Sequence, residues 1–213
     1  MNIEEAYDIW ADQYDTDQNR TRDLDAKATL ATLASVPFES VIELGCGTGK
    51  NTRFLLTRAH RVLAVDFSEK MLSQARKNIV DKRVTFQKAD ITQSWEVPDH
   101  FADLVTANLV LEHIGDLTFI FSQARLKLRP GGNFFISELH PFRQYLGSRA
   151  GFATEDGRVN PRAYPHHVSQ FLDGARQNNF HLALLQEWFD TDGADKPPRL
   201  ISFLFQANQA QEK

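Results

Sequence analysis

A glycine-rich turn between an apolar strand and a helix constrains this chain more than any other feature. The segment from Val41 to Lys50 reads Val-Ile-Glu-Leu-Gly-Cys-Gly-Thr-Gly-Lys. Gly45, Gly47 and Gly49 tolerate backbone angles that other residues avoid, and they carry no Cβ that would keep a ligand away from the backbone amides. The pattern therefore predicts a buried strand that ends in a ligand-binding turn.

The next predicted strand, 61–66, ends in Asp66. A carboxylate at this place suits the two hydroxyls of a ribose. A dinucleotide fingerprint needs glycine at the sixth position of G-x-G-x-x-G, where this chain has Lys50. The sequence thus favours a nucleoside ligand other than NAD.

Short apolar runs alternate with helical patterns along most of the chain, which is typical of strand-helix-strand units and a mainly parallel sheet. Helical spacing follows a predicted N-cap at Ser68 and recurs over 117–128 and 166–179. The closing tail, 207–213, is polar, and we expect it to fray. Strands are expected near 39–44, 61–66, 83–88, 102–108, 132–138, 181–189 and 199–206.

Composition limits the function classes. The 213 residues, 42% hydrophobic and 24% charged, suit one domain spanning 1–213. A net charge of -4 argues against a nucleic-acid partner, and no apolar run has membrane-spanning length. A single cysteine forms no disulfide within the chain, and the acidic first residues do not resemble a secretory signal. We expect a cytoplasmic protein without a metal site, and the oligomeric state is left open, with a homodimer as one candidate.

Five segments resemble, in order and spacing, the motifs of the class I S-adenosylmethionine-dependent methyltransferases, particularly the branch that acts on small molecules. The resemblance implies a Rossmann-like α/β fold: a seven-stranded, mostly parallel sheet with helices on both faces and the last strand antiparallel. It also implies S-adenosylmethionine as the cofactor. The five segments are 43–49, 65–72, 88–91, 108–114 and 128–136.

The same resemblance assigns roles around the cofactor. The glycine turn would hold the methionine moiety, Asp66 the ribose hydroxyls, and Asp90 the adenine amino group. Met71 could equally fill the core, His113 could equally cap or pack, and a nucleophilic Cys46 is disfavoured because no base lies at a meaningful spacing. The predicted cofactor-binding residues are Tyr14, Glu43, Gly45, Cys46, Gly47, Thr48, Gly49, Asp66, Phe67, Met71, Ala89, Asp90, Ile91, Asn108, Leu109 and His113.

The first 22 residues resemble the family's leading helix, which folds over the cofactor as a lid. Tyr7, Trp10 and Tyr14 share one face at helical spacing. Docking of an amphipathic helix on the core would explain Trp10 equally well. Tyr14 is the predicted cofactor contact, because its hydroxyl can reach a carboxylate while its ring excludes water.

Residues 139–164 form an irregular segment, rich in aromatic and basic residues, where the family varies its acceptor pocket. A small-molecule acceptor is expected, and an anionic one is the hypothesis that the arginines favour. If the acceptor must lose a proton, His140 is the predicted general base, since it follows the fifth strand directly. The other candidate bases after that strand are Glu138, Tyr164, His166 and His167. The predicted substrate-binding residues are Tyr145, Tyr164 and His166.

Two other functions fit the cofactor site. A regulatory protein could bind the nucleoside without turning it over. An aminopropyl transferase on the same fold would need acidic residues around a polyamine, whereas the segment after the fifth strand is mainly basic. The Asn/Asp-Pro-Pro-Tyr/Phe signature of enzymes that methylate amino groups of bases is absent after the fourth strand, where Asn108-Leu-Val-Leu stands.

Overall fold

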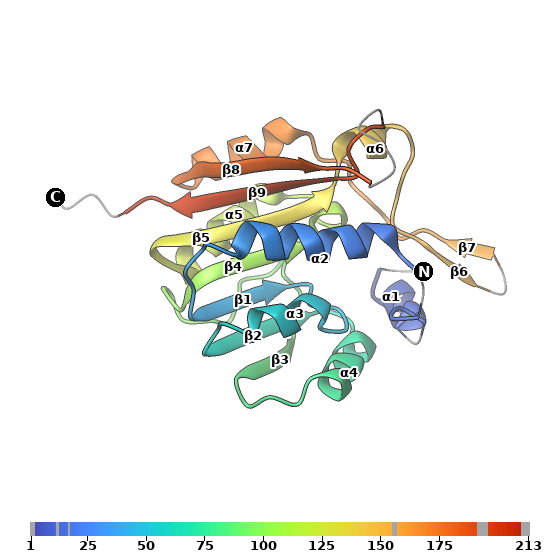
Figure 1. Ribbon diagram of the computed structural model, residues 1–213, viewed down its shortest axis with the longest axis horizontal. Coiled ribbons are helices and arrows are strands. Elements are labelled where there is room, and N and C mark those ends of the chain that lie inside the picture. Colours follow the sequence, from blue (N-terminus) through green and yellow to red (C-terminus); the bar gives the residue numbers. More distant parts are fainter. Residues whose placement is uncertain (1–2, 12, 17, 155–156, 191–195, 210–213) are drawn as a thin grey trace.

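A computed structural model describes residues 3–11, 13–16, 18–154, 157–190 and 196–209. A seven-stranded sheet forms its centre, in the order β3-β2-β1-β4-β5-β9-β8 (Figure 1). The first five strands are parallel, and β9 runs antiparallel to both β5 and β8. The strands are β1 (Ser40–Leu44), β2 (Arg61–Asp66), β3 (Val84–Lys88), β4 (Ala102–Asn108), β5 (Leu128–Leu139), β8 (Phe180–Trp188) and β9 (Leu200–Ala207). The predicted fold class is confirmed.

Helices cover both faces of the sheet (Figure 1). One hydrophobic core joins the sheet to α5 and α7, through side chains such as Phe121 and Phe171, and a second joins it to α2, α3 and α4, through Leu33, Leu55 and Leu72. Alternation within β1 supplies both cores, since Ile42 enters the first and its neighbour Val41 the second. The helices are α2 (Arg20–Leu33), α3 (Lys50–Leu55), α4 (Glu69–Asn78), α5 (Leu117–Lys127) and α7 (Val168–Gln177).

The helix after β2 begins as its capping residue predicts. The Oγ of Ser68 accepts a hydrogen bond from the backbone N–H of Met71, at 3.1 Å. The predicted strands agree with the observed ones to within one residue, except that β5 begins at Leu128, four residues early. The residues Arg129-Pro-Gly-Gly132 lie within that strand, where the pairing with β4 is irregular.

The N-terminal lid is not one helix over 1–22, as the sequence predicts, but two elements. The short helix α1 (Ile3–Trp10) lies apart from the sheet (Figure 1). The Oδ1 of Asn19 then accepts hydrogen bonds from Thr21 N and Arg22 N and so caps a new helix, α2, which packs on β5 and β9. A helix cap within the expected lid thus divides it.

The segment 139–164 is more regular than the sequence predicts. It contains the short helix α6 (Pro141–Tyr145) and a hairpin of β6 (Phe152–Thr154) and β7 (Gly157–Val159). Proline at the first helical position of α6 suits a helix start. Part of the turn expected between the last two strands, 191–195, and part of the polar tail, 210–213, lie outside the described residues.

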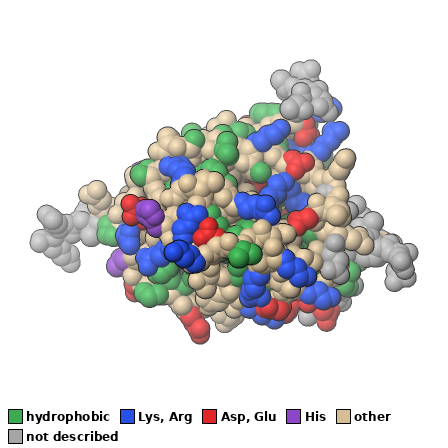
Figure 2. All heavy atoms as spheres, turned by 60° about the horizontal axis from the view of Figure 1, so that its bottom comes forward, with side chains coloured by type: hydrophobic (Ala, Val, Ile, Leu, Met, Phe, Trp, Pro, Cys, Tyr) green, Lys and Arg blue, Asp and Glu red, His purple; other side chains and the backbone are tan. Residues whose placement is uncertain are grey.

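Charged side chains of both signs are interspersed on the face turned forward in Figure 2. Ion pairs on the surface of the protein include Arg76 with Glu69 at 2.6 Å and Lys88 with Glu4 at 2.7 Å. In the part of the chain that the structure describes, no helix has the length and apolar character needed to cross a membrane.

Candidate functional site

The glycine turn occupies the end of β1 and leads directly into α3. Gly45 has φ +65° and Gly47 φ +54°, a region that residues with a side chain rarely adopt. A Cβ on Gly45 would lie 2.6 Å from Val110 Cγ2, and one on Gly47 would lie 3.9 Å from the ring of Tyr14. The turn therefore lies between the segment after β4 and the N-terminal region.

Asp66 at the end of β2 is bound to this turn. Its Oδ2 accepts a hydrogen bond from Gly47 N at 2.8 Å, and its Oδ1 accepts one from Ser68 N at 2.9 Å. The side chain is buried, and burial raises the pKa of its carboxyl to about 6, against the lowering effect of these backbone donors. A buried carboxylate fixed in this way is an acceptor for hydroxyl donors.

A cavity of about 560 Å³, here called the first cavity, opens beside Asp66 at the carboxyl ends of the parallel strands. Ligands of open α/β sheets bind at this edge. Seven residues predicted to bind the cofactor lie in its lining: Gly45, Asp66, Phe67, Ala89, Asp90, Ile91 and His113. Its other lining residues are Ile3, Glu4, Lys88, Thr92, Val110, Ile114 and Arg162.

Asp90 occupies the turn after β3, where its Oδ1 accepts hydrogen bonds from the backbone N–H and the hydroxyl of Thr92, at 2.9 and 2.7 Å. Its other carboxylate oxygen makes no hydrogen bond within the described residues. The turn therefore presents one carboxylate oxygen of Asp90 as a hydrogen-bond acceptor at a wall of the first cavity.

The remaining predicted cofactor residues lie around this cavity rather than in its lining. Glu43 accepts a hydrogen bond from Thr52 Oγ1 at 2.5 Å, and burial raises the pKa of Glu43 to about 8. Burial also raises the pKa of the Cys46 thiol well above its usual value, which disfavours a thiolate nucleophile. Met71 is buried against Trp10 in a small hydrophobic cluster, consistent with the packing role.

Thr48 and Asn108 bind other parts of the protein. The hydroxyl of Thr48 donates to Asp15 Oδ1 at 2.7 Å. The Nδ2 of Asn108 donates to Asp25 Oδ1 and to Thr29 Oγ1, each at 2.8 Å, and Asp25 Oδ2 accepts a bond from Asn51 at 2.9 Å. The buried Asp25, which sequence reasoning missed, therefore joins α2 to the end of β4 and to the start of α3.

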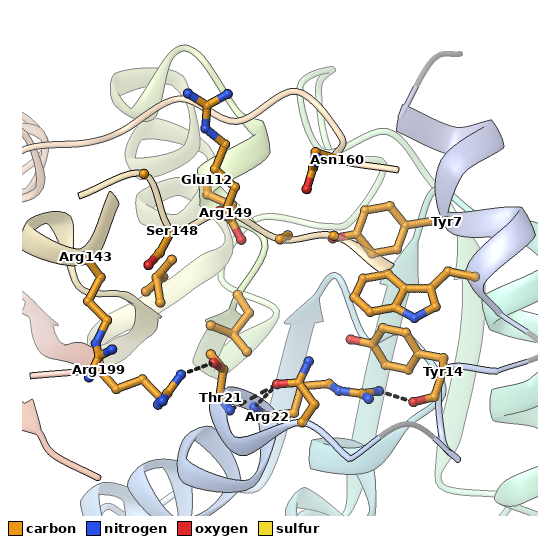
Figure 3. A pocket seen from close by; sticks show the side chains of 17 residues that line it. Tyr7, Tyr14, Thr21, Arg22, Glu112, Arg143, Ser148, Arg149, Asn160 and Arg199 are labelled. Carbon is orange, nitrogen blue, oxygen red and sulfur yellow. Dashed lines mark hydrogen bonds between the residues drawn. The ribbon is translucent and has the colours of Figure 1, made fainter. Parts of the chain in front are cut away.

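A second cavity, of about 600 Å³, lies between the N-terminal region and the segment after β5 (Figure 3). Two of the predicted cofactor residues, Tyr14 and Leu109, are part of its lining, and Leu109 has φ +53°. The cavity is lined by Tyr7, Trp10, Tyr14, Asn19, Thr21, Arg22, Leu109, Glu112, Leu139, Arg143, Gly147, Ser148, Arg149, Ala150, Gly151, Asn160 and Arg199.

Tyr7 connects the two cavities. It lines the second cavity, and its hydroxyl lies 2.7 Å from Nε2 of His113, which lines the first. The other ring nitrogen of His113 lies 2.8 Å from the carbonyl oxygen of Arg162. The sequence predicts Tyr7 on the aromatic face of the lid, but it was Tyr14 that we predicted as the cofactor contact. The helical spacing of the aromatic residues could therefore have identified Tyr7.

Tyr14 stacks against two other side chains. The guanidinium of Arg22 lies 4.0 Å from the centre of its ring, and the ring of Trp10 lies 4.8 Å away in an edge-to-face arrangement. Arg22 also donates to the Tyr14 carbonyl oxygen. Burial raises the pKa of the Tyr14 hydroxyl to about 12, so it remains a neutral donor.

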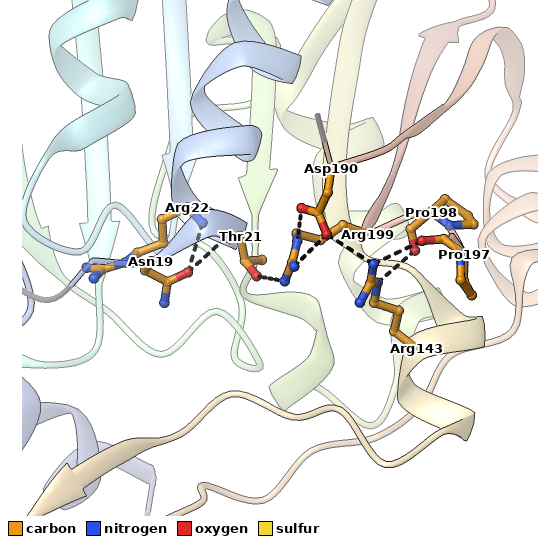
Figure 4. A network of polar contacts seen from close by, with 8 residues as sticks. All are labelled: Asn19, Thr21, Arg22, Arg143, Asp190, Pro197, Pro198 and Arg199. Atoms are coloured by element: carbon orange, nitrogen blue, oxygen red, sulfur yellow. Dashed lines mark hydrogen bonds and ion pairs between the residues drawn. The ribbon is translucent and has the colours of Figure 1, made fainter. Parts of the chain in front are cut away.

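Four arginines line the second cavity, and two of them share one carboxylate (Figure 4). Asp190 accepts from Arg199 Nε at 2.6 Å and Nη2 at 2.7 Å, and from Arg143 Nη2 at 3.2 Å. The hydrogen bonds from Arg199 are the main cause of the lowered pKa of Asp190. Arg149 is exposed and has no ion-pair partner among the described residues.

The predicted base does not lie in either cavity. The Nδ1 of His140 accepts the backbone N–H of Phe142 at 3.1 Å and so caps α6, and its Nε2 lies 3.0 Å from Oε1 of Glu187. Both ring nitrogens are therefore engaged, and neither cavity includes His140 in its lining. These contacts indicate a structural role for His140 at the start of α6, and its catalytic role stays a prediction.

The three predicted substrate-binding residues also lie outside both linings. The Nε2 of His166 lies 2.7 Å from the carbonyl oxygen of Ile114, where the histidine is buried. The ring of Tyr164 packs beside Gly115, and the hydroxyl of Tyr145 lies 2.6 Å from Nδ1 of His167 on the surface. Each was predicted from residue type and proximity to β5, which do not specify the direction of a side chain.

Comparison with known proteins identifies relatives of the chain. A family model described as a methyltransferase domain matches residues 42–136. An uncharacterized methyltransferase of Emericella nidulans is 29% identical over 90% of this chain and 78% of its own length. A trans-aconitate 2-methyltransferase of Sinorhizobium medicae is 34% identical over 56% of this chain and 45% of its own length.

The fold is also found among solved structures. An S-adenosylmethionine-dependent methyltransferase from Mesorhizobium loti superposes with a TM-score of 0.72 and 24% identity. The match covers 86% of this chain and 97% of that one.

Proposed function

We propose that this chain, a class I S-adenosylmethionine-dependent methyltransferase, transfers the methyl group to a small molecule that carries an anionic group. The observation that carries the proposal is the position of the arginine-lined second cavity. The hydrogen bond between Tyr7 of the second cavity and His113 of the first joins the two linings, so a molecule bound in the second cavity would lie next to the cofactor site.

The residues of the first cavity fit S-adenosylmethionine. The Asp66 carboxylate would accept both ribose hydroxyls, and the free oxygen of Asp90 would accept the adenine amino group. A side chain at Gly45 would clash with Val110, so this position of the turn needs glycine, and the backbone of the turn would bind the methionine moiety. When bound, the cofactor supplies a methyl group on a positively charged sulfur.

Alignment and exclusion of water are the main tasks left to the protein. Trp10 and Tyr14 form an aromatic wall of the second cavity, and Tyr7 lies beside the junction of the two cavities, where its hydroxyl is 2.7 Å from Nε2 of His113. Rings in these places exclude water from the space between acceptor and cofactor. The side chains of Arg143, Arg149 and Arg199 would orient the acceptor through its anionic group.

Two further observations support an anionic acceptor. The Sinorhizobium medicae relative, by its name, methylates trans-aconitate, which is a small carboxylate. An aminopropyl transferase would need carboxylates to bind a polyamine, whereas arginines prevail in the lining of the second cavity. The anion would compete with Asp190 for Arg143 and Arg199 and would meet Arg149 without such competition.

A panel of acceptors with labelled S-adenosylmethionine tests this function. We expect methylation of small carboxylates or phosphates, and an increase in KM of about tenfold for Arg149→Gln, which corresponds to the ~1.4 kcal/mol of one charge-assisted contact. Arg176→Gln is the matched control, because Arg176 is exposed and paired with Asp173 on α7. A preference for neutral or cationic acceptors would contradict the proposal.

A further inference from the structure

We propose that Glu112 is the general base of this enzyme and that the acceptor therefore carries its nucleophile as an O–H or N–H group, in addition to its anionic group. The inference rests on the proposed function, because it identifies the second cavity as the acceptor site. It narrows the acceptor from any small anion to a hydroxy acid or an amino acid.

The polarity of the second cavity is the first step. Glu112 is the one carboxylate among the described residues of its lining. The other charged side chains there are four arginines. In Figure 3, Arg143 and Arg199 lie on one side of the space, Tyr7 and Tyr14 lie on the other, and Glu112 lies between them. A ligand that satisfies both ends needs an anionic group for the arginines and a hydrogen-bond donor for Glu112.

The position of Glu112 next to the first cavity is the second step. Glu112 and His113 are consecutive residues of the 3-10 helix η1 (Leu111–His113), and they line the second and the first cavity, respectively. An acceptor group that donates to Glu112 is therefore held at the junction of the cavities. Arg143 and Arg199, on the side of the second cavity opposite Tyr7 and Tyr14, would bind the acceptor's anionic group away from the cofactor.

The protein fixes η1 with a second buried carboxylate. The Oε1 of Glu138 accepts hydrogen bonds from Val110 N at 3.0 Å and from Leu111 N at 2.8 Å. This contact holds the backbone just after Leu109, whose positive φ turns the chain from β4 into η1. Glu138 is thus a positioning residue, and Glu112 is presented from a rigid element.

The surroundings of Glu112 suit proton acceptance. Its side chain is 5% exposed, and burial raises the pKa of its carboxyl. The side-chain donor to it is Gln144 Nε2, at a long 3.5 Å, and Ala150 contributes a backbone hydrogen bond. A carboxylate with a raised pKa and weak donors takes up a proton more readily than an exposed one.

The reaction balances with Glu112 in this role. A lone pair on the acceptor oxygen, or on the neutral form of an amine nitrogen, would form the new bond to the methyl carbon, and the electrons of the broken carbon–sulfur bond would remain on sulfur. The acceptor atom would become positively charged, so its proton passes to the Glu112 carboxylate. A simple carboxylate acceptor has no such proton to lose and would leave Glu112 without a function.

Matched pairs of acids test the inference: β-alanine with propionate, and 4-hydroxybenzoate with benzoate. For any pair that is methylated, we expect turnover of the N–H or O–H member only, and Glu112→Gln should lower its kcat at least 100-fold. In calorimetry with S-adenosylhomocysteine present, the N–H or O–H member should bind more tightly than its partner in the wild type, and Glu112→Gln should abolish that difference.

Glu69→Gln is the matched control, because it makes the same substitution at an exposed residue that pairs with Arg76 outside both cavities. It should retain kcat within about threefold. The inference is overturned if Glu112→Gln keeps wild-type kcat and the wild-type difference in binding, or if propionate and benzoate react as well as their partners. If none of the acids binds or reacts, the proposed function fails together with this inference. If the acids bind normally and binding does not depend on Glu112, only this inference fails.

Discussion

The two cavities of this enzyme are built from different kinds of chain segment. The first cavity is lined mainly by turns at the carboxyl ends of β1 to β4, within residues 45–114. The second joins segments from 7–22, 109–112 and 139–160 with Arg199, which are far apart along the chain. Adjacent parallel strands bring their own ends together, whereas the second cavity depends on packing between distant elements.

Charge also separates the two sites. In the first cavity one buried carboxylate, Asp66, is held by backbone N–H groups, and burial raises its pKa. In the second, two of the four arginines, Arg143 and Arg199, pair with Asp190, whose pKa is lowered chiefly by its hydrogen bonds with Arg199. The first site thus uses fixed backbone donors, and the second uses side chains that an incoming anion can recruit.

The largest effect is expected for Asp66→Ala. The substitution removes the acceptor for two ribose hydroxyls and leaves the N–H groups of Gly47 and Ser68 without their partner. We expect S-adenosylhomocysteine to bind about 100-fold more weakly, roughly 2–3 kcal/mol, in calorimetry. Asp81→Ala is the control, since Asp81 pairs with Arg83 outside both cavities. Equal losses in both variants would mean that Asp66 does not bind the ribose hydroxyls.

The pH dependence of cofactor affinity should be the next largest effect. Ribose hydroxyls donate to the ionised form of Asp66, whose pKa in the folded protein is about 6. Binding therefore releases a proton below pH 6, and affinity should rise by about tenfold from pH 5 to pH 7 and then level off. The reverse sign applies to folding, because a pKa raised above 3.8 makes ionised Asp66 a cost to stability above about pH 4. Calorimetry in buffers of different ionisation enthalpy measures the proton, and Asp66→Asn should abolish the dependence.

A smaller effect is expected where the two cavities meet. Tyr7→Phe removes the hydroxyl bound to His113 and keeps the ring, so S-adenosylhomocysteine affinity should fall about fivefold, close to the ~1 kcal/mol of one hydrogen bond. Tyr145→Phe is matched to it, because that hydroxyl also binds a histidine but lies outside both cavities. Unchanged affinity in Tyr7→Phe would show that the contact does not support the cofactor site.

The smallest effect on activity is expected for His140→Ala. Loss of the cap on α6 should lower stability by about 1 kcal/mol, or a few degrees in the thermal midpoint, and leave kcat within about twofold. Scanning calorimetry and steady-state kinetics measure the two quantities. A 100-fold fall in kcat would restore His140 as the base and would count against Glu112.

The first site was predictable because its residues follow short-range rules. Gly45 follows a buried strand, Asp66 ends the next one and Asp90 begins the turn after the third, and each lies in the lining of one cavity. The strand pattern gave the sheet, and parallel strands place their ends at one edge. Neither the order of residues nor their type revealed that the Asn108 side chain binds Asp25 instead of facing this cavity.

The second site was only partly predictable. The basic character of 139–164 indicated an anion site, but Arg22 and Arg199 reach it from elsewhere in the chain. Side-chain direction depends on tertiary packing, so His140 and His166 looked like site residues although their ring nitrogens bond within the fold. Glu112 lies within the predicted segment 108–114, in a helical turn beside His113. It was overlooked because the histidine was chosen as the hydrogen-bonding residue of that segment.

The contact between Tyr7 and His113 also bears on the order in which the enzyme takes up its two substrates. The helix that completes a wall of the acceptor cavity is fastened to a histidine of the cofactor cavity. Cofactor bound in the first cavity would therefore fix the position of α1 before the acceptor binds. We expect compulsory-order kinetics, in which S-adenosylmethionine binds first and the demethylated cofactor leaves last.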